Sequence, residues 1–291
     1  MIEYLQRYWG YCLCNSIKEQ SLLFFWGSGS NGKSVLTETL LNMFGDYGLK
    51  ADNVFLTNST KPSDNDRKQQ ITALLRNKRI VIFSELNSNT KLDEGLIKEN
   101  TGSKTQTSRR LYKSYETFEA THKVIIEGNY KPIIRGTDWG IWRRIKIVKF
   151  GKIFGAEEID RNLTDKLLAE KDGIFAWILE GYRKWRSEGL GEEPESMRME
   201  INEYRSDSDV LGQFIEERLV QTEESWEFSG DIYQSYLAWL TINGYDRKVT
   251  KRKLTSELES RGFNRDNSNN RKPKFIGVKL FEQEEELASS M

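Results

Sequence analysis

The segment from Ser21 to Phe44 constrains this chain more than any other stretch of its 291 residues. A compact apolar run, Ser21-Leu-Leu-Phe-Phe-Trp26, leads without a gap into Gly27-Ser-Gly-Ser-Asn-Gly-Lys-Ser34. Beyond this loop, apolar side chains from Val35 to Phe44 recur at helical spacing. A buried strand that enters a helix through a glycine-rich loop predicts an α/β domain built on a parallel sheet.

The loop has the spacing Gly-x-x-x-x-Gly-Lys-Ser, which suits a bound nucleotide. Its glycines let successive backbone N–H groups turn inward around an anion, and the helix directs its positive N-terminus at the same point. Lys33 then reaches the terminal phosphates, and the Ser34 hydroxyl is a ligand for Mg²⁺. The predicted ATP contacts are Gly27, Ser28, Gly29, Ser30, Asn31, Gly32, Lys33 and Ser34. The pattern alone does not separate a kinase from a GTPase or a helicase.

Two further apolar runs end in polar side chains that suit hydrolysis. Ile80-Val-Ile-Phe83 is followed by Ser84 and Glu85, and a carboxylate there can bind Mg²⁺ and orient water. Val124-Ile-Ile126 is followed by Gly128-Asn129, whose amide can contact the γ-phosphate or the attacking water. Each has a plainer interpretation on its own, as a strand ending at the surface or as a Gly-Asn turn.

Composition narrows the possible functions. Basic and acidic residues number 44 each, so any nucleic-acid contact must come from a local patch. The one histidine, His122, excludes most histidine-based catalysis, and Cys12 and Cys14 lack the spacing of a zinc site or a disulfide framework. The sequence has no signal peptide and no apolar run long enough to span a membrane, which favours a cytoplasmic protein without a membrane partner.

Residues 104–120 alternate as expected for a β-hairpin, with a turn near Lys113-Ser114. The hairpin is basic, and aromatic side chains are interleaved with the charges. Basic groups neutralise phosphates, whereas aromatic faces stack on bases. The candidate DNA contacts are Lys104, Arg109, Arg110, Tyr112 and Lys113. The plainer alternative is a solvated hairpin with one basic face.

A second basic patch lies between Arg247 and Lys274, with ten Lys or Arg against three acids. Residues 226–282 are expected to form two helices, a polar loop and a strand, a layout that resembles a winged helix. In such a fold Lys251 and Lys253 enter a major groove, while Arg271 and Lys272 lie along the backbone. The alternative is a small helical cap whose charges only solvate it.

The order of these elements resembles the helicase portion of superfamily 3 primase-helicases of the phage P4 and poxvirus D5 type. The resemblance is close over residues 1–150 and covers the rest only in general layout. The residues that carry it are Gly27 to Ser34, Phe83 to Glu85, Thr101 to Ser103, Arg109 to Tyr112, Thr121 to Lys123, Gly128 to Pro132 and Gly136 to Arg144.

This resemblance implies an AAA+-like ATPase core with a role for each motif. Lys33 and Ser34 would be Walker A, Glu85 the Walker B carboxylate and Asn129 sensor 1. Arg143 or Arg144 would be an arginine finger that reaches the ATP of a neighbouring subunit. One position departs from the pattern, because superfamily 3 proteins often carry two adjacent acids at Walker B and this chain has Ser84 before Glu85.

The implied function is an ATP- and Mg²⁺-dependent replicative helicase of a phage or mobile element. It would move on single-stranded DNA as a ring, expected to be a hexamer with 3′ to 5′ polarity, with the basic hairpin in the channel. Further implied partners are duplex origin DNA and a primase or polymerase domain in a longer parent chain. Two alternatives stay open: a phosphate-loop enzyme such as a small-molecule kinase, and an origin-binding protein with an ATP switch.

We expect five parts along the chain. Residues 1–20 would be an N-terminal helix left from a collar, and residues 21–155 the ATPase core. A helical region with a linker would occupy 156–225, the winged-helix-like domain 226–282, and an acidic tail 283–291. Within these parts we expect a surface loop over residues 52–66, a helix over residues 158–187 and a return to helix from about residue 200.

Overall fold

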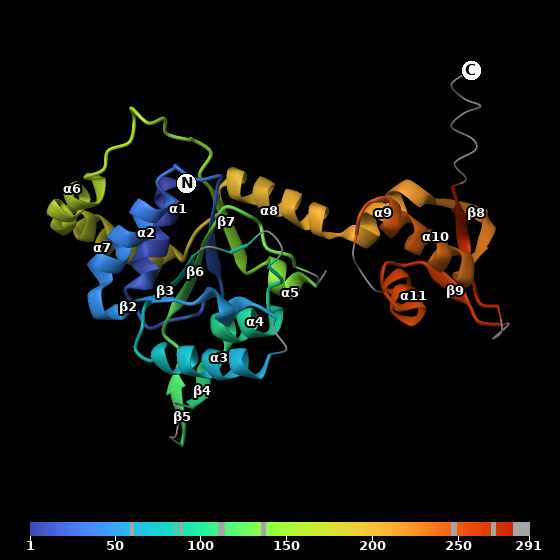
Figure 1. The fold of residues 1–291 in the computed structure, drawn as a ribbon, viewed down its shortest axis with the longest axis horizontal. Helices are drawn as coiled ribbons and strands as arrows, with labels where there is room; N and C mark the ends of the chain where they lie inside the picture. The colour runs from blue at the N-terminus through green and yellow to red at the C-terminus, as the bar shows by residue number, and fades with distance from the viewer. Residues whose placement is uncertain are drawn as a thin grey trace. The chain divides into compact units, whose positions relative to one another are not determined.

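The computed structural model describes residues 1–58, 61–84, 86–87, 90–109, 114–134, 138–245, 249–268 and 272–281. The chain forms two compact units, Met1–Ser208 and Asp209–Met291 (Figure 1).

The first unit is built on a five-stranded sheet in the order β2-β3-β6-β1-β7, in which every neighbouring pair is parallel (Figure 1). The strands are β1 (Leu22–Trp26), β2 (Gly48–Ala51), β3 (Ile80–Ser84), β6 (Lys123–Gly128) and β7 (Ile145–Lys149). All but β2 coincide with strands expected from the sequence, so the prediction of an α/β fold with a parallel sheet is confirmed. The carboxyl ends of β1, β3 and β6 meet at one edge, where ligands bind in open α/β sheets.

Helices cover both faces of this sheet, which explains its continuous apolar runs. Phe24 and Phe83 belong to one buried cluster and Phe25 and Ile82 to another, as successive side chains of a strand point to opposite faces. The helices are α1 (Ile2–Cys12), α2 (Lys33–Phe44), α3 (Pro62–Leu74), α4 (Glu94–Gly102), α5 (Trp139–Trp142), α6 (Leu163–Ala169), α7 (Lys171–Glu188) and α8 (Glu195–Ser208).

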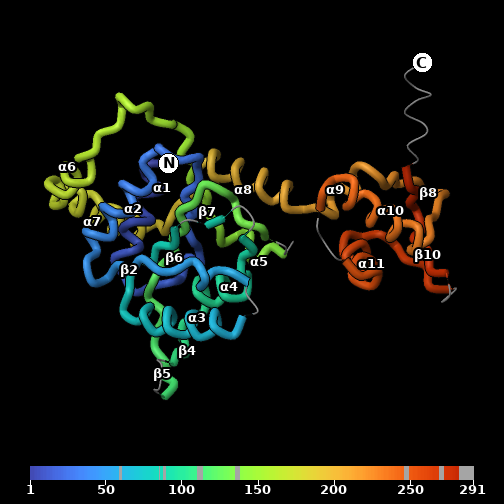
Figure 2. The backbone as a smooth tube through the Cα atoms, in the orientation of Figure 1, coloured from blue at the N-terminus to red at the C-terminus, as the bar shows by residue number. Residues whose placement is uncertain are grey.

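Two expectations for the first unit were wrong. Residues 52–66 are not one surface loop, because a 3₁₀ turn, Asn53–Leu56, buries Phe55 and α3 already begins at Pro62. The expected helix over 158–187 begins later, since residues 151–162 cross from β7 to α6 without a regular helix (Figure 2). There Glu158 accepts a hydrogen bond from Gly155 N and Asp160 from Asn162 N. Such local side-chain bonds compete with helix formation.

Two glycines allow α1 and α7 to pack backbone against backbone. A Cβ added at Gly181 would overlap the carbonyl group of Gln6, and one added at Gly10 would overlap the backbone of Tyr182. Neither obstacle is the end of a flexible side chain, so the helices would have to separate. The contact therefore fixes the position of α1 against α7, and both helices contribute side chains to the buried cluster that contains Phe25 and Ile82.

Gly181→Ala is expected to lower the free energy of unfolding of the first unit by about 3 kcal/mol, the upper range for overpacking. Gly173→Ala is the matched control on the same helix, because nothing lies within 4 Å of its added Cβ. Alanine there should stabilise the helix by about 0.5–1 kcal/mol. Urea unfolding followed by circular dichroism measures both, and equal effects of the two variants would contradict the close packing.

The basic hairpin was predicted correctly. β4 (Thr105–Arg109) and β5 (Tyr115–Glu119) form a two-stranded antiparallel sheet, with Thr107 opposite Thr117. Its turn lies outside the described residues. β5 leads into β6 through Ala120, Thr121 and His122 alone, so the hairpin is tied closely to the central sheet.

The second unit has its own core and a three-stranded antiparallel sheet in the order β8-β10-β9. Its elements are α9 (Val210–Arg218), β8 (Leu219–Phe228), α10 (Ser229–Ile242), α11 (Lys251–Ser260), β9 (Asn264–Asp266) and β10 (Lys274–Leu280).

This unit begins at Asp209 instead of residue 226, because the Asp209 carboxylate pairs with Arg261 at the end of α11 and β8 pairs with β10. The helix expected from about residue 200 therefore ends at Ser208, and a strand was missed. β8 is an edge strand whose middle residues are exposed, so the alternation that marks a half-buried strand is weak.

Candidate active site

The glycine-rich loop joins β1 to α2 at the carboxyl edge of the sheet. Gly29 and Gly32 have φ values of 106° and 86°, which residues other than glycine rarely adopt. Gly27 is needed for a different reason, since a Cβ there would overlap the side chain of Asn31 and the carbonyl of Phe150. Gly32 is the N-cap of α2 and offers no side-chain oxygen. The first N–H groups of the helix are thus directed at the loop interior, which suits an anion.

Lys33 lies across the mouth of this loop and is 4% exposed. Its ammonium donates to the Gly27 carbonyl at 2.7 Å and to Asn31 Oδ1 at 2.9 Å. Burial lowers the pKa of Lys33, and the nearby Glu127 carboxylate partly opposes this. Keeping this ammonium buried therefore costs folding free energy, and an anion bound in the loop would offset that cost.

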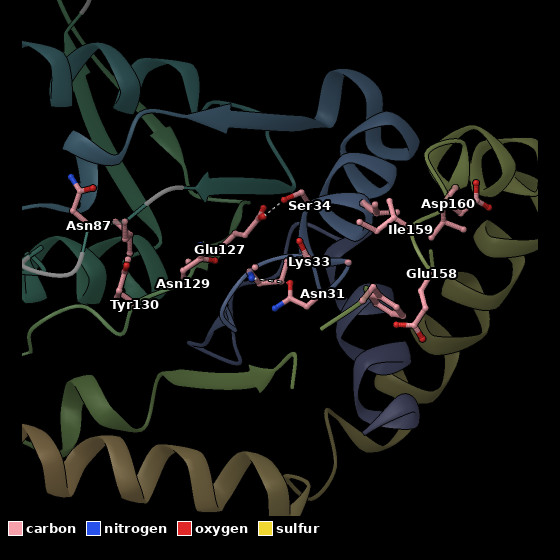
Figure 3. Close-up of a pocket in the computed structure, with 18 residues that line it drawn as sticks. Asn31, Lys33, Ser34, Asn87, Glu127, Asn129, Tyr130, Glu158, Ile159 and Asp160 are labelled. Carbon is pink, nitrogen blue, oxygen red and sulfur yellow. Dashed lines mark hydrogen bonds between the residues drawn. The ribbon is translucent and has the colours of Figure 1, made fainter. Parts of the chain in front are cut away.

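Glu127 faces the loop from β6, although no role was predicted for it from the sequence. Glu127 is 8% exposed and accepts a hydrogen bond from Ser34 Oγ at 2.5 Å (Figure 3). It accepts another from Thr37 Oγ1 at 2.8 Å. Glu127 is an acid within a strand that is buried at every position. An acid inside an apolar run was therefore the sequence signal that could have identified it. Buried acids are rare without a partner or a function.

One cavity of about 610 Å³ contains these groups. Asn129 and Tyr130 line it beyond Glu127, while Ile159 and its neighbours line the opposite side (Figure 3). The Asn129 amide nitrogen lies 3.9 Å from the Cβ position of Gly29, so the predicted amide does face the loop. Glu85 lies outside the described residues, although Leu86 and Asn87 after it reach the cavity.

The other side of the cavity combines apolar side chains with the acids Glu158 and Asp160, and most of it comes from the segment that was expected to be helical. Phe154, Ile159 and Leu163 line it together with Val35 of α2. The Phe154 N–H donates to the carbonyl of Ser30 at 2.8 Å, which ties this segment to the glycine-rich loop. The cavity therefore offers a polar anion site next to an apolar space.

Arg143 and Arg144 have different surroundings although they are adjacent. Arg144 is 9% exposed, and its guanidinium donates to Thr101 Oγ1 at 3.1 Å and to the Gly140 carbonyl. Burial is the main cause that lowers the pKa of Arg144, with Arg143 adding to it. Arg143 is exposed and its guanidinium contacts the side chain of Gln20 at 2.5 Å. Only Arg143 presents its charge at the surface.

The predicted DNA contacts fall into two groups. In the hairpin, Lys104 and Arg109 are exposed, and Arg109 lies 5.5 Å from the ring of Tyr115, which is itself 66% exposed. In the second unit, Lys251 and Lys253 are exposed on the first turn of α11, and Lys272 lies over the ring of Phe228. The remaining four candidates are outside the described residues: Arg110, Tyr112, Lys113 and Arg271.

None of the helices in the described part of the chain is both long and apolar enough to cross a membrane.

Known proteins that are similar to this chain indicate its family. The family described as Poxvirus D5 protein-like matches residues 206–285, which is nearly all of the second unit. A putative helicase of Acanthamoeba polyphaga mimivirus is 30% identical over 262 residues, 84% of this chain and 27% of that protein. A putative primase of African swine fever virus is 24% identical over 276 residues, 88% of this chain and 28% of that protein. The chain belongs to the D5-like primase-helicase family.

The D5-like chain thus spans little more than a quarter of the length of these relatives. Among solved structures, the apo form of the NrS-1 C-terminal region is similar, with a TM-score of 0.55 at 16% identity. The match covers 96% of this chain and 70% of that one. This likeness supports the fold of both units.

Proposed function

We propose that this D5-like chain is the ATP-dependent helicase portion of a viral or mobile-element replication protein. One observation carries the proposal: a glycine-rich loop with Lys33 and Ser34 shares a single cavity with Glu127 of β6 and with Asn129, which directly follows that strand. The names of the mimivirus and African swine fever virus relatives, a putative helicase and a putative primase, support replication as the setting.

Each group in the cavity has a role in this proposal. The loop N–H groups and the N-terminus of α2 would hold the β-phosphate, and Lys33 would neutralise charge on the transferring γ-phosphoryl group. Asn129 would orient water at the γ-phosphate, and Glu85 would accept its proton. The apolar space beside Ile159 would take the adenine base. Ser34 would hold Mg²⁺, and the bound cation would supply charge neutralisation for the phosphates.

A complete site needs a second copy of the chain. We assign the arginine finger to Arg143 because Arg143 is exposed, whereas Arg144 is buried and bonded to Thr101 and Gly140. A finger supplied in trans makes turnover depend on assembly, as expected for a ring.

We assign single-stranded DNA to the β4–β5 hairpin and duplex origin DNA to the second unit. Arg109 and the exposed ring of Tyr115 pair a charge with a stacking surface. The element order of the second unit, helix, strand, helix, helix, strand, strand, supports a winged helix whose α11 presents Lys251 and Lys253. A primase or polymerase domain in a longer parent protein completes the proposal.

The deciding experiment is the ATPase rate per subunit against protein concentration, with and without single-stranded DNA. A rate that climbs with both concentration and DNA is expected for shared active sites in a DNA-threaded ring. A flat rate that ignores DNA would overturn the trans finger and the helicase assignment, and would favour a kinase-like enzyme complete in each monomer. Duplex binding that is lost with residues 209–291, in a chain that never unwinds DNA, would favour an origin-binding switch.

The hairpin assignment makes a separate prediction. Replacement of both Lys104 and Arg109 by alanine should reduce the salt dependence of single-stranded DNA binding, lowering the slope of log K against log salt by about 1.4. Fluorescence anisotropy with a labelled oligothymidine across a salt series measures it. Arg183→Ala, which removes an exposed charge from α7, is the control and should leave the slope unchanged. An unchanged slope in the double variant would remove the hairpin from the DNA path.

A further inference from the structure

The acid that is missing before Glu85 has a counterpart on the neighbouring strand. β3 and β6 pair in parallel with Ser84 directly opposite Glu127. On its other side β6 pairs with β1, where Glu127 is opposite Phe25, two residues before the loop begins. A carboxylate moved from position 84 to position 127 therefore stays at the same level of the sheet and comes one strand nearer the glycine-rich loop.

We propose that Glu127 is the carboxylate on the Mg²⁺ side of the nucleotide site, where it replaces the acid absent at Ser84. The inference rests on the proposed ATP site, and it adds a residue from β6 to that site.

The contacts of Glu127 place it against the metal-binding hydroxyl. Ser34 Oγ, the group expected to bind Mg²⁺, donates a hydrogen bond to Glu127 Oε1 at 2.5 Å. This bond directs the lone pairs of Ser34 away from the carboxylate, which is the orientation a cation ligand needs. The second oxygen, Oε2, is held by Thr37 one turn further along α2. Glu127 would therefore support the cation through the hydroxyl group that binds it, and one acid at this place suffices for that role.

The electrostatic surroundings of Glu127 also favour a cation. Among the described residues, no Lys or Arg nitrogen lies within 4.0 Å of its carboxylate. Glu200 offers the contrast, because it is also 8% exposed but lies between Lys131 and Lys149. The Lys33 ammonium interacts with Glu127 from beyond that distance. A buried carboxylate whose direct contacts are hydroxyl groups keeps part of its charge uncompensated, and a divalent cation would offset that cost.

The test separates metal binding from catalysis. A fluorescent, non-hydrolysable ATP analogue is titrated into the wild type in Mg²⁺ and in EDTA, and the ratio of the two affinities gives the Mg²⁺ contribution. In Glu127→Gln this ratio should fall by about 10–100-fold, the usual cost of losing a group that supports a metal ligand. Affinity in EDTA should stay close to that of the wild type. The electron paramagnetic resonance spectrum of Mn²⁺ with the same analogue should show weaker Mn²⁺ binding.

Three further variants make the outcome specific. Ser84→Asp in the Glu127→Gln background should recover part of the ratio, because it places a carboxylate on β3 directly opposite position 127. Glu200→Gln, the matched buried acid, should lower the melting temperature and leave the ratio unchanged. If Glu127→Gln does not fold, Glu127→Asp keeps the charge at a shorter reach and should give an intermediate ratio.

The outcomes for the two proposals can be told apart. A wild-type ratio in Glu127→Gln or in Glu127→Asp would overturn the inference and leave Glu127 as a cap for two hydroxyl groups of α2. Failure of the wild type to bind the analogue in either buffer would instead overturn the proposed ATP site itself.

Discussion

Lys33→Ala is expected to reduce ATP hydrolysis by roughly 10²–10³-fold, the usual loss when a positioned donor to the transition-state charge is removed. Lys33 is buried, and it is the one basic residue between Gly27 and Ser34. No other side chain of the loop can therefore replace its charge. Its burial lowers its pKa, so the fold gains little from the charge in the absence of phosphate. Turnover should therefore collapse while the melting temperature changes by only a few degrees.

The measurement is a phosphate-release assay beside a thermal melt. Lys50→Ala removes an exposed lysine from β2 and should leave both readings near those of the wild type. Normal turnover in Lys33→Ala would overturn the whole ATPase assignment. A collapse of both turnover and melting temperature would instead mark Lys33 as a structural residue.

Arg143→Ala is expected to lower the maximal ATPase rate by about 10³-fold or more, as for other fingers that act on a phosphoryl group. Nucleotide affinity should change little, because the finger would act on a neighbouring site. Arg144→Ala should behave differently. Its loss leaves buried partners such as Thr101 Oγ1 without their donor and should cost about 1–3 kcal/mol of folding free energy.

A mixing experiment tests the trans arrangement directly. Lys33→Ala keeps its finger and loses its site, whereas Arg143→Ala keeps its site and loses its finger. A mixture of the two inactive variants should recover measurable ATPase activity through composite sites. Arg186→Ala, an exposed change on α7, serves as the control and should stay fully active. No recovery in the mixture, under conditions where the wild type assembles, would place the missing function within one subunit.

The central sheet could be predicted from sequence because both of its faces are buried. Runs such as Leu22–Trp26 and Ile80–Phe83 are apolar at every position, so they stand out without knowledge of their partners. The loop from Gly27 to Ser34 was equally visible, since its glycines and lysine are fixed by backbone geometry within eight consecutive residues.

What could not be predicted depends on contacts between distant segments. Glu127 acquires its place opposite Ser84 from the register of two strands, and register is not written in either strand alone. Arg143 and Arg144 look equivalent in sequence, yet Arg144 is the one that is buried and bonded to Thr101 of α4. β8 was missed for a related reason, because an exposed edge strand carries little hydrophobic pattern.

The position of β6 has a consequence for how this molecule can move. Both edges of β6 are paired, to β1 and to β3, and its side chains are buried at every position. Its amide protons should therefore be among the slowest of the first unit to exchange with deuterated water. Glu127 lies near the carboxyl end of β6, and the hairpin precedes its amino end. We therefore expect β6 to connect the two rigidly. If the hairpin moves relative to the cavity, we expect the elements around β6 to generate the movement, because β6 itself should not bend.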